Sequence, residues 1–119
     1  MTTAPADEPA PELLDRIRAS LNEGHLREVR MFGAIAVMVD DSMAVAVHKD
    51  GSILVRVDPS EDRYLLARPG ASRAEMGVGR SMGEGWIRVE PGALHSDASL
   101  HTWLQAGTRC LTRRRHPST

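Results

Sequence analysis

The most specific catalytic pattern in this sequence is Gly79-Arg80-Ser81-Met82-Gly83, which matches the G-x-S-x-G elbow that carries the nucleophile of serine hydrolases. Asp97 and His101 follow it in the order in which those hydrolases supply their acid and base. An elbow needs a strand before the serine and a helix after it, so that the hydroxyl projects beside oxyanion-hole N–H groups. Loop-like residues precede Ser81, strand-like residues follow it, and Asp97 is a natural helix cap. We therefore expect a glycine loop, with a small serine hydrolase as the alternative.

A zinc site is a second chemistry to consider, because His95, Asp97 and His101 are close together in the sequence. Structural zinc sites generally use paired Cys or His residues at short, regular spacing. Cys110 is the single thiol of the chain and has no companion. We expect no metal site and no cofactor, and we expect Cys110 to pack as a small apolar residue.

Three consecutive arginines near the C-terminus, Arg113, Arg114 and Arg115, could contact phosphates without reading a base sequence. Cations at this position also complement the C-terminus of a helix, which explains them equally well. The formal net charge is −1, so no overall field favours a polyanion. A lone Phe32 cannot form the stacking platform of an RNA-binding sheet. Weak, phosphate-directed DNA binding is therefore kept as a further alternative.

The length of 119 residues allows one domain with its own core. Residues 1–10 are small, acidic and proline-bearing, which predicts a disordered lead-in. We expect the domain to cover residues 11–113 and a basic flexible tail to cover 114–119. A single thiol points to a reducing compartment, and no apolar run reaches the length of a membrane span, so we expect a cytoplasmic protein.

The N-terminal half predicts one helix followed by three strands. Apolar residues recur at helical spacing over about 11–23. Alternating apolar residues then predict strands over 29–39, 43–47 and 53–57. Asp50-Gly51 is a strong two-residue hairpin signal between the last two. Short turns between consecutive strands predict an antiparallel meander.

The C-terminal half predicts a short helix, one or two strands and a last helix. Asp58-Pro59-Ser60-Glu61 has the form of a capping box, so a helix is expected over about 59–68. The glycine-rich residues 70–85 predict loops around at most a brief strand near Met76. Residues 86–90 alternate as a strand, and Ser96 or Asp97 can cap the last helix. The order α-β-β-β-α-β(β)-α predicts an α+β fold of two layers, in which helices cover an antiparallel sheet.

Arg30-Met31-Phe32-Gly33, near the start of the first predicted strand, resembles the opening motif of the TfoX/Sxy family N-terminal domain. Further similarities follow in order along the chain, ending with the Leu100-to-Trp103 pattern of the last helix. The resemblance covers about residues 13–113. Two positions depart from the family pattern, since Ala34 stands where a second glycine is usual and Gly107 where alanine is more common.

The resemblance implies a regulatory role rather than an enzymatic one. Family members are associated with control of competence genes and act alongside a transcription activator. The resemblance also implies protein contacts, with a transcription regulator as the expected partner, and a homodimer. It points to Arg30, Met31, Phe32, Gly33 and Trp103 as structural or interaction residues. Longer members carry a C-terminal helical domain, so we expect this chain to be a stand-alone N-terminal domain.

Overall fold

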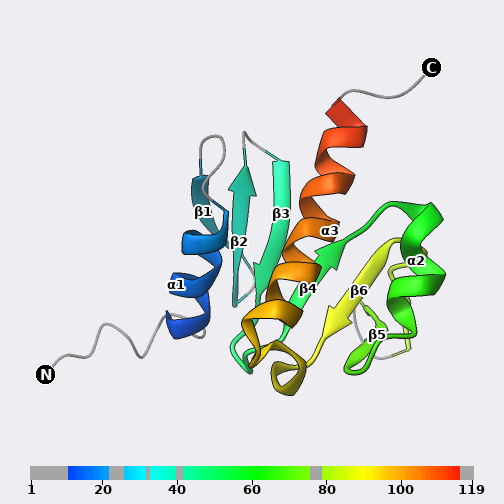
Figure 1. Cartoon of the computed structure of the whole chain (residues 1–119), viewed down its shortest axis with the longest axis horizontal. Coiled ribbons are helices and arrows are strands. Elements are labelled where there is room, and N and C mark those ends of the chain that lie inside the picture. The colour runs from blue at the N-terminus through cyan, green and yellow to red at the C-terminus, as the bar shows by residue number, and fades with distance from the viewer. Residues whose placement is uncertain (1–10, 22–25, 32, 40–41, 76–78, 116–119) are drawn as a thin grey trace, which may run out of the picture.

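The structure, a computed structural model, describes residues 11–21, 26–31, 33–39, 42–75 and 79–115. Its elements in chain order are α1 (Pro11–Ser20), β1 (Leu26–Met31), β2 (Ala34–Val39), β3 (Ser42–Val47), β4 (Ile53–Arg56), α2 (Pro59–Leu66), β5 (Ala71–Arg73), β6 (Trp86–Val89), the 3-10 helix η2 (Pro91–Leu94) and α3 (Asp97–Arg115). The strands form a six-stranded sheet in the order β1-β2-β3-β4-β6-β5, with every neighbouring pair antiparallel. The helices lie in front of the sheet in Figure 1. The predicted two-layer α+β fold is confirmed.

The segment 29–39, expected as one strand, is divided between β1 and β2. Gly33 lies between them with a φ of 79°, a left-handed conformation that glycine adopts without steric cost. Met31 pairs with Ala34 across this turn, so the chain reverses and β2 runs back along β1. The alternation of apolar residues continues through Gly33 without a break, which is why the pattern alone predicted a single strand. The meander therefore has four strands.

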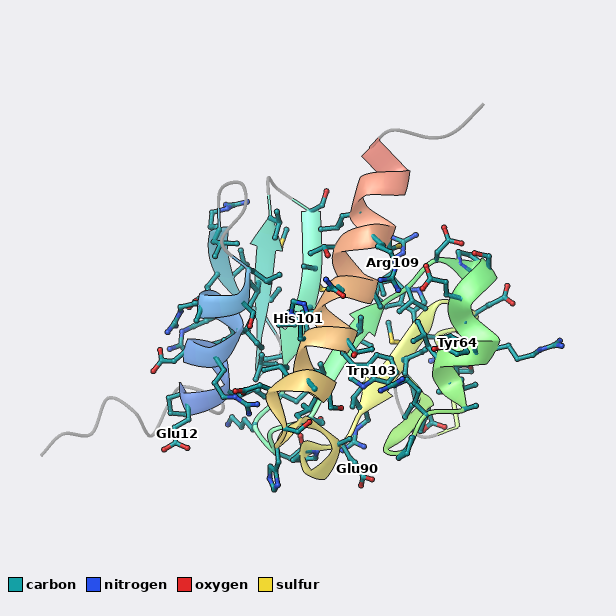
Figure 2. The ribbon with its side chains drawn as sticks, in the orientation of Figure 1. Glu12, Tyr64, Glu90, His101, Trp103 and Arg109 are labelled. Atoms are coloured by element: carbon teal, nitrogen blue, oxygen red, sulfur yellow. The ribbon has the colours of Figure 1, made fainter. Side chains whose placement is uncertain are left out.

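The core lies between the helices and one face of the sheet. Leu14 and Ile17 of α1 and Trp103 of α3 are fully buried, and so are Ile53 and Val55 of β4. Figure 2 shows Trp103 beneath α3, on the side that faces the sheet. Because few core residues are aromatic, the interior depends on branched aliphatic side chains, which pack well on a pleated surface.

Gly107 allows α3 to approach the sheet closely. A Cβ at this position would lie 2.8 Å from the backbone oxygen of Ala44 and 3.4 Å from Cγ1 of Val55. Ala44 lies at an irregularity, because the register between β2 and β3 shifts at Val37 and Met38. Such a bulge bends the strand locally. The backbone of β3 therefore comes within reach of the helix at the one buried position of α3 that has no side chain.

The Asp58 cap and the reversal at Asp50-Gly51 are confirmed, but the hairpin loop covers residues 49–51 rather than the predicted two residues. The chain reverses at Asp50-Gly51, where the His48 N–H donates to the Ser52 carbonyl at 2.9 Å and Gly51 has a φ of 88°. At the start of α2, an Asp58 carboxylate oxygen accepts from the Ser60 N–H at 2.9 Å. In each turn, the donor and acceptor of the hydrogen bond lie two to four residues apart in the sequence. The local sequence is therefore sufficient to specify the turn.

Glu61, the last residue of the capping-box motif, also bonds outside its own helix. Its carboxylate accepts from Arg109 of α3 at 2.5 Å. This ion pair joins α2 to α3.

The last helix begins and ends at residues the sequence only partly predicted. The Ser96 hydroxyl accepts from the Ser99 N–H at 3.0 Å, so Ser96 is the cap. Helix α3 continues to Arg115, which places Arg114 and Arg115 in the helix rather than in the expected flexible tail. The expected lead-in over 1–10 and residues 116–119 lie outside the described residues. In the described ranges, no helix combines the length and the apolar character needed to cross a membrane.

Candidate functional site

Ser81 lies in a short connection ahead of β6 and not in a nucleophile elbow. It forms an isolated antiparallel bridge with Glu75, and the chain continues through a turn into β6. The Ser81 hydroxyl accepts a hydrogen bond from the Gly83 N–H at 3.0 Å, and the side chain is exposed. An elbow would instead lead from a strand directly into a helix. The hydroxyl therefore stabilises a local turn.

The other two members of the expected triad are engaged elsewhere. The Asp97 carboxylate accepts from Arg16 of α1 at 3.0 Å, so it does not orient an imidazole. His101 is exposed on α3. Within the described ranges, no histidine forms a hydrogen bond with Ser81. The three residues that suggested a hydrolase are thus not brought together.

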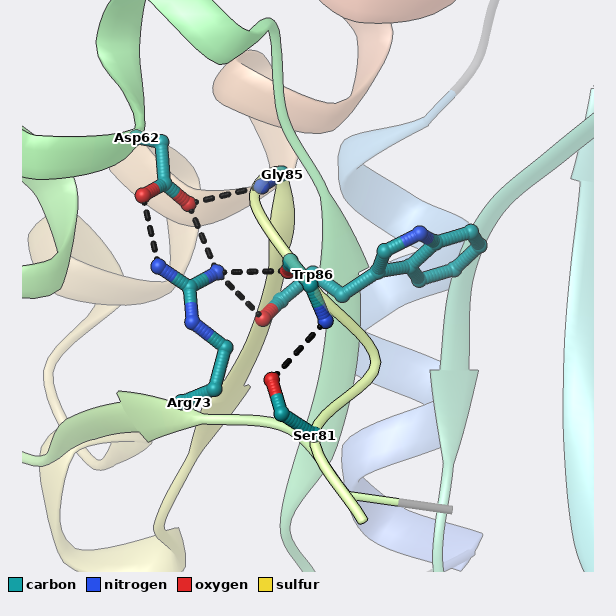
Figure 3. Close-up of polar contacts among 6 residues, drawn as sticks. Asp62, Arg73, Ser81, Gly85 and Trp86 are labelled. Carbon is teal, nitrogen blue, oxygen red and sulfur yellow. Dashed lines mark hydrogen bonds and ion pairs between the residues drawn. The ribbon is translucent and has the colours of Figure 1, made fainter.

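The glycine-rich segment is organised by a buried ion pair that we did not predict. Asp62 of α2 is only 4% exposed, and its two oxygens accept from Arg73 of β5 at 2.8 and 2.6 Å. The Gly85 N–H donates to the same carboxylate at 2.7 Å. Arg73 also donates to the carbonyl oxygens of Gly83 and Trp86, at 2.7 and 3.2 Å (Figure 3). This cluster fixes the path of residues 83–86 against α2.

The chemistry of this cluster is structural. The bonds from Arg73 hold the pKa of the Asp62 carboxyl below its usual value, and the Gly85 N–H adds to that effect, while burial opposes it. A carboxylate with three donors stays ionised and has no proton to give. The signal in the sequence was an acidic residue three positions before Leu65, on the face of α2 that is buried.

The other residues considered from the sequence are the candidate metal ligands, Cys110 and the C-terminal arginines. In the residues that the structure describes, no three His, Cys, Asp or Glu side chains are arranged to hold a metal. Cys110 is buried and free, as a packing residue would be. Arg113 lies in the last turns of α3 with Arg114 and Arg115, and the side chains of all three lie outside the described residues.

The helices all pack on one face of the sheet. Arg18 of α1 forms an ion pair with Glu28, which pairs in register with Val37. Gly107 of α3 lies against Val55, and Asp62 of α2 bonds to Arg73, which pairs with Ile87. Since side chains alternate along a strand, the residues between these positions point to the opposite face. No helix of the described ranges covers that second face.

An apolar strip crosses this uncovered face. Val29, Ala36, Ala46 and Leu54 are paired in register across four strands. Ala36 and Ala46 are buried, while Val29 and Leu54 are half-buried. Met38 and Met43, which pair with each other, widen the strip on one side and are also half-buried. We call these six residues the open-face strip. Small central residues with flexible methionines beside them make a shallow surface that can adapt to a partner.

Charged residues border the open-face strip. Arg27 pairs with Met38 across β1 and β2, and Arg88 pairs with Leu54 across β6 and β4. Arg56 stacks over the ring of Trp86 at 5.1 Å from its centroid. An apolar centre with aromatic and arginine residues at its edge is the composition found in protein interfaces. The sequence carried one signal for this surface. Both the even-numbered and the odd-numbered residues of β2 are apolar, whereas a strand with one face in water alternates between apolar and polar residues.

The family model described as the TfoX N-terminal domain matches residues 18–111. The chain belongs to the TfoX N-terminal domain family. The match begins within α1 and ends within α3, so it includes every strand of the sheet. No curated protein and no solved structure matched the chain. Membership places this TfoX N-terminal domain among competence-regulator-like domains, in a family that is not known for enzymes.

The motif residues of the TfoX N-terminal domain divide into two groups. Arg30 is exposed near the end of β1, and Gly33 makes the turn into β2. Met31 closes that turn by pairing with Ala34, and Phe32 lies outside the described residues. Trp103 is fully buried, and its indole Nε1 has no hydrogen-bond partner among the described residues. Packing therefore accounts for Trp103, whereas Arg30 and Met31 lie at the end of the edge strand β1 and Gly33 lies in the turn that follows it.

Proposed function

We propose that this TfoX N-terminal domain is a non-enzymatic regulatory module that acts by binding a protein, with a transcription regulator as its partner. The domain works as a homodimer and presents its open-face strip to that partner. Family membership supports the regulatory role. The observation that carries the contact mechanism is the open-face strip itself, because a soluble sheet face without a covering layer normally alternates with polar residues.

The composition of the face favours a protein over a nucleic acid. Its centre is made of alanine, methionine and leucine side chains, which bury apolar surface and offer no hydrogen bonds to bases. The arginines lie at the margin, where they would meet carboxylates of the partner and guide its approach. A phosphate-binding surface would instead need cations across the contact area.

The experiment is genetic and has a matched control. The chromosomal copy is deleted in the native host, and transcripts are compared after complementation with wild type, Leu54→Glu or Tyr64→Glu. Leu54→Glu puts a carboxylate into the open-face strip, whereas Tyr64 is 68% exposed on α2, in the helical layer. We expect wild type and Tyr64→Glu to restore the transcript profile and Leu54→Glu to fail while remaining folded. Full complementation by a folded Leu54→Glu protein would refute the proposed surface.

A further inference from the structure

Strand β1 is an edge of the sheet. It stands at the end of the strand order and pairs only with β2, and the described part of the chain offers no strand to its outer side. An edge strand of six residues presents a row of backbone N–H and C=O groups that can pair with another strand. In Figure 1, β1 lies at the rim of the sheet, with α1 in front of it.

The geometry of an antiparallel ladder limits how two copies of β1 could pair. Alternate residues of an edge strand direct their backbone groups outward, so residues of equal parity must meet in both copies. Each allowed register is therefore centred on one residue, which faces itself across a twofold axis. Centring the pair on Arg27, Glu28 or Arg30 would place two like charges directly opposite each other, which is unfavourable.

Centring the pair on Val29 instead places opposite charges across from each other. Glu28 of each copy then faces Arg30 of the other, so two pairs of opposite charge form by symmetry. Arg18 already holds the Glu28 carboxylate from α1, which fixes its position and lowers its pKa through a hydrogen bond. A carboxylate has enough lone pairs to accept from a second guanidinium as well.

We propose that a second copy of this chain pairs antiparallel along β1, with the twofold axis at Val29 and Glu28 opposite Arg30 of the other copy. The inference rests on the proposed function for the homodimer and names the surface that forms it. Equal parity keeps the helices of both copies on the same side of the joined sheet. The open-face strip of each copy starts at Val29, so the two strips become continuous across the axis. The partner-binding surface is thereby doubled.

Charge exchange provides a direct test by sedimentation velocity. Arg30→Glu places a second carboxylate opposite Glu28, and Glu28→Arg places a second guanidinium opposite Arg30. Each variant alone should therefore dimerise at least about tenfold more weakly than wild type. An equimolar mixture of the two variants restores opposite charges across the axis and should form a 1:1 heterodimer. The variant that carries both exchanges should again form a homodimer.

Two control variants test whether the effect is specific to this interface. Arg63→Glu reverses an exposed charge on α2 and Arg68→Glu reverses a charge beyond that helix, and both should leave the dimer in place. Circular dichroism verifies that each variant is folded. A monomeric wild type, single variants that dimerise as wild type does, or a mixture that stays monomeric would each refute the proposed pairing. Assemblies that grow without limit would refute it too, since they indicate head-to-tail contacts between different edges.

Failure of the proposed β1 dimer can be distinguished from failure of the proposed regulatory role. If the edge pairing is wrong but Leu54→Glu still abolishes complementation, the domain acts through its open-face strip without this dimer. If the dimer forms as described and Leu54→Glu complements fully, the pairing stands and the proposed partner surface does not.

Discussion

Asp62 and Arg73 form a two-bond ion pair that joins helix α2 to the edge strand β5, with nitrogen-to-oxygen distances of 2.8 and 2.6 Å. The side chain of Asp62 is 6% exposed and that of Arg73 is 27% exposed, so the pair is mostly removed from water. Through the Gly83 and Trp86 carbonyl oxygens, the same guanidinium holds the chain that enters β6. One charge pair therefore fixes the path of residues 83–86 through hydrogen bonds to their backbone.

Breaking this pair at one end should be costly. Asp62→Asn would leave the Arg73 charge without its counterion, and we expect a loss of about 3–5 kcal/mol in the free energy of unfolding. Replacing both residues, as Asp62→Leu with Arg73→Met, should cost less than the sum of the two single changes, because no charge is then left unpaired. Urea denaturation of wild type, the two single variants and the double variant provides the measurement. Strict additivity would contradict a coupled pair.

We expect the protein to lose folding stability at acid pH through the hairpin residue Asp50. Hydrogen bonds from the Ser52 hydroxyl and N–H lower the pKa of Asp50 from 3.8 to about 2, with a smaller effect from Arg88. A depressed folded pKa contributes stability that is present above about pH 4 and is lost as the pH falls toward 2. Since the side chain is 58% exposed, we expect this contribution to be on the order of 1 kcal/mol.

The Asp50 prediction is checked by comparing wild type with Asp50→Asn. The difference in unfolding free energy should be present at pH 7 and should shrink at acid pH, where the wild-type carboxyl is protonated. A carbon-detected titration should show Ser52→Ala raising the pKa of Asp50 more than Arg88→Met does. An equal difference at both pH values would mean that the ionised form contributes nothing.

The sequence predicted the parts of this fold whose causes are local. The Asp50-Gly51 turn and the Asp58 cap are satisfied by residues two to four positions away, so their sequence is sufficient. The turn at Gly33 escaped prediction because the alternation continues through it, and only the pairing of Met31 with Ala34 reveals the reversal.

The candidate surface depends on contacts that no local pattern encodes. Ala36 and Ala46 belong to one strip only because β2 and β3 pair in a particular register. Asp62 and Arg73 are 11 positions apart on a helix and a strand, and neither spacing nor residue type identifies them as partners. Sequence reasoning instead singled out Ser81, because its motif is written in consecutive residues.

At Gly107 of α3, we expect alanine to destabilise the fold, in contrast to its usual effect inside a helix. Alanine normally stabilises a helix interior by up to about 1 kcal/mol relative to glycine. Here its Cβ would lie 2.8 Å from a backbone oxygen of β3, so α3 would have to move. We expect Gly107→Ala to lower the free energy of unfolding by about 1–2 kcal/mol. Gly92→Ala is the matched control, since no atom of the described residues lies within 4 Å of its Cβ position, and it should be neutral or slightly stabilising. A stabilised Gly107→Ala protein would contradict the close approach.

At Trp103, we expect replacement by phenylalanine to cost unusually little stability. Its indole Nε1 is buried and has no partner in the part of the chain that the structure describes, so Trp103→Phe removes no hydrogen bond seen there and relieves an unsatisfied donor. The smaller ring leaves some empty volume, and we expect a net loss below about 1.5 kcal/mol. Trp103→Ala should lose about 3–5 kcal/mol because it empties a fully buried site. Thermal unfolding of both variants provides the test, and equal losses would mean that the indole N–H has a partner after all.

Ser81 gives the prediction that bears most directly on function. Its hydroxyl accepts one hydrogen bond from an exposed turn, so Ser81→Ala should cost no more than about 1 kcal/mol in stability. The same substitution should leave complementation of the deletion strain unchanged, because Ser81 is not part of the open-face strip. It should also leave any background hydrolysis of activated esters unchanged, and His101→Ala should behave in the same way. If the wild type hydrolyses such esters with saturation kinetics, and Ser81→Ala and His101→Ala each abolish that activity while staying folded, the chain is a hydrolase. The turn would then have to rearrange on binding substrate, since the imidazole must come within hydrogen-bond reach of the serine for the chemistry to proceed.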